Sequence, residues 1–136
     1  MKQTVLVVDD DDSTRFVLAQ TLKQLGCRVV SASDGAEVPD LLAQYAFDLL
    51  VIDLYMPGMN GFELLRRVRR TTSFLPTPRT SATVRVLVVS GENNPASMDN
   101  AKALGADAYL VKPVDVDELE CAVLKLLPRK ANARSG

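Results

Sequence analysis

The chain has 136 residues, of which 47% are hydrophobic and 24% charged, and its formal net charge is −1. This length predicts one domain with a sizeable core, and the lack of a basic excess gives no reason to expect nucleic acid or an anionic membrane as a partner. Because the sequence contains no histidine, histidine-based catalysis, a zinc–histidine site and a phosphohistidine carrier are excluded.

The first half of the chain alternates strand-like runs with helical periods. Residues 4–8 form a short β-branched run, of the kind that is buried on both faces of a parallel sheet. Leucines at i, i+4 and i+7 then predict one face of a helix that ends at Gly26, namely Leu18, Leu22 and Leu25. A second strand is expected at residues 27–32, and a short helix at 39–46 admits Pro39 only in its first turn.

The second half continues the same alternation. The remaining strands are expected at residues 48–54, 84–90 and 107–111, and the remaining helices at 62–70, 98–104 and 119–126. Five such strand–helix units predict an α/β fold with a parallel sheet and helices on both faces. The connection at 71–83 is long, since about 2–6 residues are usual between a helix and the next strand.

We expect one domain over residues 1–128, followed at 129–136 by a polar, basic segment that is a disordered tail or the start of a linker. No signal peptide is recognisable at the N-terminus, and no apolar run approaches the roughly 20 residues that span a bilayer. Cys27 and Cys121 form no metal-type or redox-type cluster and are interpreted as reduced thiols of a cytoplasmic protein.

Polar side chains follow the predicted strands where each strand ends: Asp9, Asp10, Asp53, Ser90 and Lys112. Ligands of open parallel sheets bind at these carboxyl ends. If the first and third strands are neighbours, about 4.8 Å apart, their three aspartates share one pocket. Three carboxylates so close together cannot all ionise cheaply without a cation, and a hard ion with oxygen ligands, Mg²⁺ in a cell, suits them.

A carboxylate, a hydroxyl and a lysine beside Mg²⁺ are suited to phosphoryl transfer. The cations neutralise phosphoryl oxygens, the hydroxyl donates a hydrogen bond, and the carboxylate can be the nucleophile. The chain has no glycine-rich phosphate loop, which disfavours a bound nucleotide. The simplest hypothesis is therefore phosphorylation of a protein aspartate.

Four motifs, in this order, resemble the receiver domain of two-component response regulators, the CheY-like family: VLVVDDDDSTR, DLLVIDLYMPGMNGFELL, VRVLVVSGE and GADAYLVKPVD. The resemblance covers roughly residues 3–127. It implies a doubly wound, flavodoxin-like (βα)5 fold with the strand order 2-1-3-4-5, which is the order of this family.

The resemblance also assigns roles to the acidic residues. Asp53 matches the aspartate that accepts the phosphoryl group. The implied Mg²⁺, which Mn²⁺ can replace, would be held by Asp9, Asp10, Asp53 and the backbone carbonyl of Tyr55. Asp10 would ligate the ion directly and Asp9 largely through water. No further cofactor is implied.

The remaining matched residues act on the phosphoryl group or respond to it. Ser90 matches the hydroxyl that senses the group, and Lys112 matches the lysine that pairs with it. Tyr109 matches the aromatic switch residue, although taken alone it would more often be a half-buried strand aromatic. The family position of Pro113 implies a cis Lys112–Pro113 bond.

The implied partners are those of a phosphorelay. A sensor histidine kinase or a phosphotransfer protein would donate, and a downstream effector or output domain would respond. The responding face, built from residues 98–104, 107–111 and 119–126, could also form a homodimer. Such a regulator catalyses only its own phosphotransfer and autodephosphorylation, binds no nucleic acid directly and is not attached to a membrane.

Two other functions remain open. A Mg²⁺-dependent phosphatase of the haloacid-dehalogenase type also uses an aspartyl nucleophile, but it requires a second aspartate where Tyr55 stands, and the chain has no cap domain. A receiver-like module could also bind partners without phosphorylation.

Local alternatives remain as well. Asp11, Asp12 and Ser13 are expected to start the first helix, one of them capping it. The side chain of Tyr55 either covers the pocket mouth, forming a lid with Glu92 that keeps hydrolytic water out, or points into solvent. The basic run at residues 66–70 is a solvated helix face or a docking patch.

Overall fold

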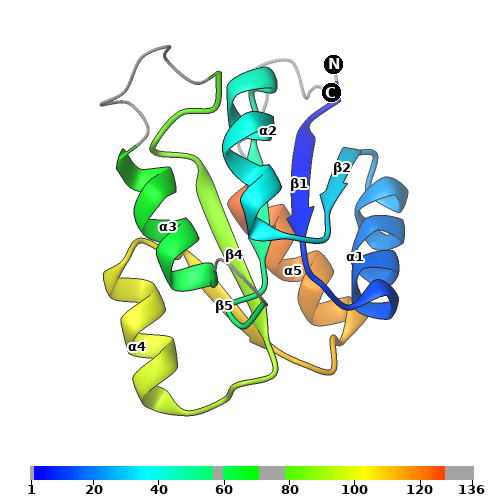
Figure 1. Cartoon of the computed structure of the whole chain (residues 1–136). Coiled ribbons are helices and arrows are strands. Elements are labelled where there is room, and N and C mark those ends of the chain that lie inside the picture. Colours follow the sequence, from blue (N-terminus) through cyan, green and yellow to red (C-terminus); the bar gives the residue numbers. More distant parts are fainter. Residues whose placement is uncertain (1, 57–59, 71–78, 128–136) are drawn as a thin grey trace.

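A computed structural model describes residues 2–56, 60–70 and 79–127. The strands are β1 (Thr4–Val8), β2 (Arg28–Ala32), β3 (Leu49–Ile52), β4 (Arg85–Ser90) and β5 (Ala108–Val111). They form one parallel sheet in the order β2-β1-β3-β4-β5 (Figure 1). This order confirms the expected doubly wound α/β fold, and every strand lies inside its predicted range. Most of the 71–83 connection and the tail at 129–136 lie outside the described residues.

The helices also follow the predicted alternation. They are α1 (Asp12–Gln24), a 3-10 turn η1 (Gly35–Glu37), α2 (Val38–Gln44), α3 (Gly61–Arg70), α4 (Pro95–Ala103) and α5 (Val116–Leu126). Pro39 stands in the first turn of α2, as expected. The last two helices begin three residues earlier than predicted, because Asn94 and Asp115 accept hydrogen bonds from the amides of Ser97 and Glu118 and cap the helices there.

The helices cover both faces of the sheet (Figure 1). On one face, α1 and α5 bury Leu18, Leu22, Leu119 and Val123 against the sheet. On the other face, α2, α3 and α4 pack against the alternate residues of the same strands. The central strands are therefore apolar throughout, as strands covered on both faces must be. None of the helices described is long and apolar enough to cross a membrane.

The register of the sheet brings the strand ends together. Val8 is level with Ile52, and Ile52 is level with Val88 on the next strand. Ser90 is level with Val111. The residues that follow these positions therefore emerge along one edge of the sheet, where the sequence predicted a site.

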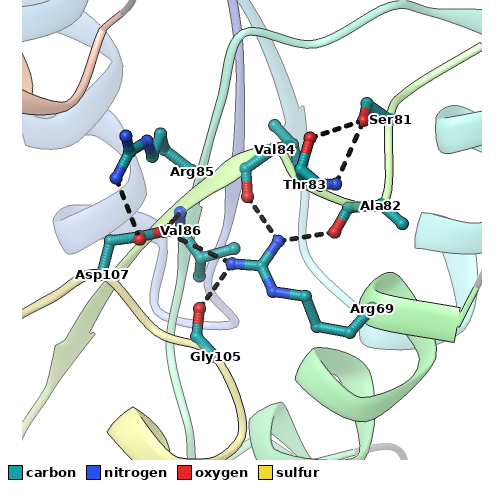
Figure 2. A network of polar contacts seen from close by, with 9 residues as sticks. All are labelled: Arg69, Ser81, Ala82, Thr83, Val84, Arg85, Val86, Gly105 and Asp107. Carbon is teal, nitrogen blue, oxygen red and sulfur yellow. Dashed lines mark hydrogen bonds and ion pairs between the residues drawn. The ribbon is translucent and has the colours of Figure 1, made fainter.

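Arg69, near the end of α3, joins three chain segments at the opposite edge (Figure 2). Its guanidinium donates to the carbonyls of Ala82, at 2.9 Å, and Val84, at 2.5 Å. It also donates to the carbonyl of Gly105 and lies 3.3 Å from a carboxylate oxygen of Asp107. Burial lowers the pKa of Arg69, and the charge of Asp107 opposes that shift. The guanidinium of Arg69 thus donates both to carbonyls that precede β4 in the chain and to a carbonyl that precedes β5.

Gly105 is required at this junction for two reasons. Its φ is 109°, a conformation that other residues rarely adopt. A Cβ atom there would also lie 2.5 Å from the Nε atom of Arg69. The helix end that the sequence predicted at Gly105 is therefore also a place where a side chain from α3 passes close to the backbone.

Thr80 anchors the described end of the 71–83 connection from the other side. Its side chain is buried, its amide donates to the carbonyl of Leu42 at 3.1 Å, and its hydroxyl accepts from the amide of Phe47 at 3.0 Å. Residues 79–84 are consequently held between the end of α2 and the end of α3.

We predict that Arg69→Met lowers the free energy of unfolding by about 2–3 kcal/mol, because several carbonyls lose a charged donor. The matched control is Arg67→Met, which removes an exposed arginine that, within the described part of the chain, pairs with Glu63 across one helical turn and should cost about 0.5 kcal/mol or less. Urea unfolding measures both values. Equal losses in the two variants would contradict the role given to Arg69.

Candidate functional site

Three carboxylates meet at the carboxyl edge of the sheet. Oxygens of Asp9, Asp10 and Asp53 all lie within 4.8 Å of one another. Asp9 and Asp53 follow adjacent strands and are 0% and 5% exposed, whereas Asp10 is exposed. The structure thus brings together the three aspartates that the sequence placed in one pocket.

Lys112 lies between two of these carboxylates. Its ammonium nitrogen is 3.0 Å from Oδ2 of Asp9 and 3.2 Å from Oδ2 of Asp53. The peptide bond between Lys112 and Pro113 is cis, as the family resemblance implied. Lys112 enters the pocket from β5 and crosses the end of β4, where its amide donates to the carbonyl of Ser90 at 2.8 Å. One ammonium therefore faces two carboxylates, and the third remains uncompensated by it.

The carboxylate of Asp9 is only partly satisfied by protein donors. Its Oδ1 accepts from the amide of Asp11 at 2.9 Å. Its Oδ2 is buried and, among the described residues, has an ion pair with Lys112 but no well-formed hydrogen bond. Buried carboxylate oxygens rarely lack a hydrogen-bond donor. A hard cation with oxygen ligands fits this pocket, because it would satisfy that oxygen and offset the excess negative charge.

The electrostatics of Asp53 are dominated by burial. Burial raises the pKa of Asp53 above its ordinary value of 3.8; the charge of Lys112 acts against this shift, and that of Asp9 adds to it. Burial acts to lower the pKa of Lys112, but its contacts with Asp9 and Asp53 outweigh burial and raise the pKa. The pocket thus holds its lysine charged and resists a negative charge on Asp53.

The residues after the pocket start α1, as predicted. Asp11 is the N-cap and accepts from the amide of Thr14 at 2.9 Å, and the Thr14 hydroxyl and amide lower the pKa of Asp11. Asp12 forms an ion pair with Arg15 one turn later. Arg15 also donates to the backbone carbonyl of Asp9 at 2.7 Å, so the helix start supports the pocket that precedes it.

Ser90 and Tyr109 meet beside the pocket. The Ser90 hydroxyl is buried and accepts from the amide of Glu92 at 3.1 Å. The Tyr109 hydroxyl donates to the carbonyl of Glu92 at 2.6 Å. Burial raises the pKa of the Tyr109 phenol, and the neighbouring Ser90 hydroxyl opposes that shift. Both side chains therefore contact the loop that enters α4.

The side chain of Tyr55 is anchored to α4, which contradicts the alternative that it points into solvent. The other alternative, a side chain that covers the pocket mouth, stays a prediction. Its hydroxyl lies 2.8 Å from Oγ of Ser97 in α4. Its ring packs edge-on against Phe62, with centroids 6.0 Å apart. Glu92, the predicted partner in a lid, accepts hydrogen bonds from the amide of Asn94 and from the hydroxyl of Tyr109. The side chain is half exposed but anchored, so it does not simply point into solvent.

Gly61 is a site residue that the sequence reasoning did not single out. A Cβ atom at this position would lie 2.5 Å from the carbonyl oxygen of Asp53 and 2.6 Å from Cα of Leu54. The start of α3 therefore packs directly on the backbone that carries Asp53. The available signal was the pair of glycines in MPGMNG, within a motif that the resemblance already used.

Fold and pocket together define a doubly wound α/β protein with a cluster of three carboxylates at the carboxyl ends of its strands. The family model described as "Response regulator receiver domain" matches residues 5–124. The chain therefore belongs to the receiver domain family of two-component response regulators. Receiver domains are signalling domains and not classical enzymes, which weighs against the phosphatase alternative.

Individual relatives agree with this family. The chain is 30% identical to sporulation initiation phosphotransferase F of Bacillus subtilis, over 97% of this chain and 99% of that protein. It is 33% identical to transcriptional regulatory protein AfsQ1 of Streptomyces coelicolor, over 93% of this chain but 52% of that protein. The structure of the Vibrio cholerae chemotaxis protein CheY4 superposes with a TM-score of 0.80 at 31% identity, covering 93% of this chain and all of that one.

We predict that Asp53→Asn stabilises the metal-free protein near neutral pH, because asparagine imitates the protonated form that the pocket favours. Because the pKa of Asp53 is raised, the folded protein binds a proton at this carboxylate more tightly than the unfolded chain does. The cost of ionising Asp53 is therefore absent below pH 3.8 and develops as the pH rises through the raised pKa. Urea unfolding in EDTA should show the variant more stable at about pH 7 and the difference shrinking towards about pH 4. A variant that is less stable at neutral pH would refute this account.

Proposed function

We propose that this chain is a phosphorylation-controlled signalling module in which Asp53 accepts a phosphoryl group from a phosphohistidine. The donor would be a sensor histidine kinase or a phosphotransfer protein. The observation that carries the proposal is the buried pair of Asp9 and Asp53 bridged by Lys112, with the carboxylate of Asp10 within 4.8 Å of both, so that one ammonium faces a cluster of three acids. The Bacillus subtilis relative is a phosphotransferase by name, which supports the same chemistry.

The transfer is a displacement at phosphorus. A carboxylate oxygen of Asp53 forms the new P–O bond, the P–N bond to the donor histidine breaks, and its electron pair returns to the imidazole nitrogen. Lys112, already 3.2 Å from Oδ2 of Asp53, would pair with a phosphoryl oxygen. The hydroxyl of Ser90 would donate to another after leaving the amide of Glu92. In-line attack needs these groups held in place, and the ends of three strands hold them.

A divalent cation would complete the pocket. Asp9, Asp10, Asp53 and the backbone carbonyl of Tyr55 are the proposed ligands of Mg²⁺, or of Mn²⁺ in its place. When bound, the ion supplies positive charge that offsets the carboxylates and the incoming phosphoryl oxygens. The exposed Asp10 would ligate it directly, and the buried Asp9 largely through water.

The response would reach a partner through α4, β5 and α5. Tyr109, on β5, already contacts the loop into α4, so a movement of Ser90 would change the space available to its ring and shift the population of this face. The partner would be an effector or output domain, or a second copy of this chain. We propose that the receiver domain covers residues 1–128 and that it acts in the cytoplasm. It would bind neither nucleic acid nor membrane directly.

We predict that incubation with Mg²⁺ and acetyl phosphate adds one phosphoryl group to the wild-type chain, and that Asp53→Asn abolishes the adduct. Intact-mass spectrometry measures it. The matched control is Asp40→Asn, which changes an exposed aspartate of α2 and should leave the adduct unchanged. An adduct that persists in Asp53→Asn would place the acceptor elsewhere.

We predict that Asp10→Asn weakens Mg²⁺ binding by at least about tenfold. Substitution of residues that only hydrogen-bond to a metal ligand commonly weakens binding about 10- to 100-fold, and loss of a ligand should cost no less. Calorimetric titration of the unphosphorylated protein measures the affinity. Asp12→Asn is the control, because this neighbouring carboxylate is exposed and paired with Arg15. Equal affinities in the wild type and Asp10→Asn would exclude direct ligation by Asp10.

A further inference from the structure

The hydrogen bond between Tyr55 and Ser97 joins two segments that are 42 positions apart in the chain, at an oxygen–oxygen distance of 2.8 Å. Tyr55 belongs to the loop that follows Asp53, and Ser97 stands in the first turn of α4. Ser97 is only 9% exposed. This contact therefore connects the pocket segment to α4 without passing through Ser90 or Tyr109.

Tyr55 is held at three points along its length. Its amide donates to Oδ1 of Asp53 at 3.3 Å, its ring edge packs on Phe62, and its hydroxyl meets Ser97. Beyond its backbone a tyrosine has only two rotatable side-chain bonds before the planar ring, so little slack separates the backbone from the hydroxyl. A displacement of the Tyr55 backbone must either move Ser97 or break the hydrogen bond.

The two ends of α4 are held differently. Beyond its C-terminus, the carbonyl of Gly105 is fixed by Arg69 of α3. At its N-terminus, Asn94 caps the helix, and the two tyrosine hydroxyls reach it from other elements: Tyr55 at Ser97 and Tyr109 at the preceding loop. Neutral hydrogen bonds of this kind are individually modest. The N-terminal end is thus the end of α4 that small changes at the pocket can release.

We propose that Tyr55 and Ser97 form a latch that couples the Asp53 pocket directly to the start of α4, in parallel with Ser90 and Tyr109. The proposal rests on the proposed function, because loading of the pocket moves the Tyr55 backbone only if its carbonyl faces the bound cation. Coupling of this kind is reciprocal. A partner that displaces α4 therefore alters the affinity of the pocket through the same hydrogen bond, and Tyr55 acts as a positioning residue.

The first test needs no metal. Amide hydrogen exchange at residues 98–101 should be about two- to tenfold faster in Tyr55→Phe than in the wild type, the factor expected from losing one neutral hydrogen bond. Ser97→Ala should act similarly, and the double variant should be no faster than Tyr55→Phe alone, because one interaction is removed in each case. The control is Tyr45→Phe, since none of the hydrogen bonds among the described residues uses the Tyr45 hydroxyl. Unchanged exchange in Tyr55→Phe, or additive effects in the double variant, would overturn the latch.

The second test loads the pocket with Mg²⁺ and beryllofluoride, a mimic of the phosphoryl group, and follows amide shifts by NMR. In the wild type, residues 96–101 should shift together with residues near Asp53. In Ser97→Ala, which alters no proposed ligand, the pocket residues should still respond while the shifts in α4 fall by about twofold or more. Undiminished shifts in α4 would overturn the coupling. A wild-type pocket that does not respond at all would instead contradict the proposed function, and the metal-free exchange rates would still decide whether the latch exists.

Discussion

The constraint on which this molecule depends is the crowding of like charges at the carboxyl edge of a parallel sheet. Adjacent strands deliver Asp9 and Asp53 into the same buried space, and Lys112 bridges them. One ammonium cannot compensate three carboxylates, so the pocket retains an excess of negative charge. That residual demand for positive charge is what makes a cation, and then a phosphoryl group beside it, chemically reasonable here.

The contacts at the amino ends of the strands differ in kind from those at the carboxyl ends, where the pocket lies. At the edge away from the pocket, Arg69 and Thr80 satisfy backbone groups of several segments and hold the ends of α2 and α3 against the sheet. At the pocket edge, the contacts that hold the start of α4 to Tyr55 and Tyr109 are neutral hydrogen bonds made by tyrosine and serine hydroxyls. Elements that move in switching are drawn from the less stable parts of a fold, and α4 is anchored in agreement with that rule.

Much of the fold could be predicted because its signals are local. Apolar β-branched runs, leucine spacing, caps and helix-ending glycines each act within a few residues, so the five strands and the five main helices were expected in the right order. The starts of α4 and α5 were predicted three residues too late, because their caps, Asn94 and Asp115, were not recognised. The roles of Asp53, Asp10 and Ser90 came from family resemblance and remain proposals.

The sequence by itself determined where acids, a hydroxyl and a lysine stand at the ends of strands, in a chain without histidine. Parallel strands end at one edge, so that pattern already implied a shared pocket. Only the tertiary structure decided that Lys112 bridges Asp9 and Asp53, that Gly61 packs on the backbone of Asp53, and that Tyr55 bonds to Ser97. The reason is physical: each of these contacts joins elements brought together by packing, at distances that depend on helix placement and side-chain rotamers, and none of the three contacts leaves a periodic pattern in the sequence.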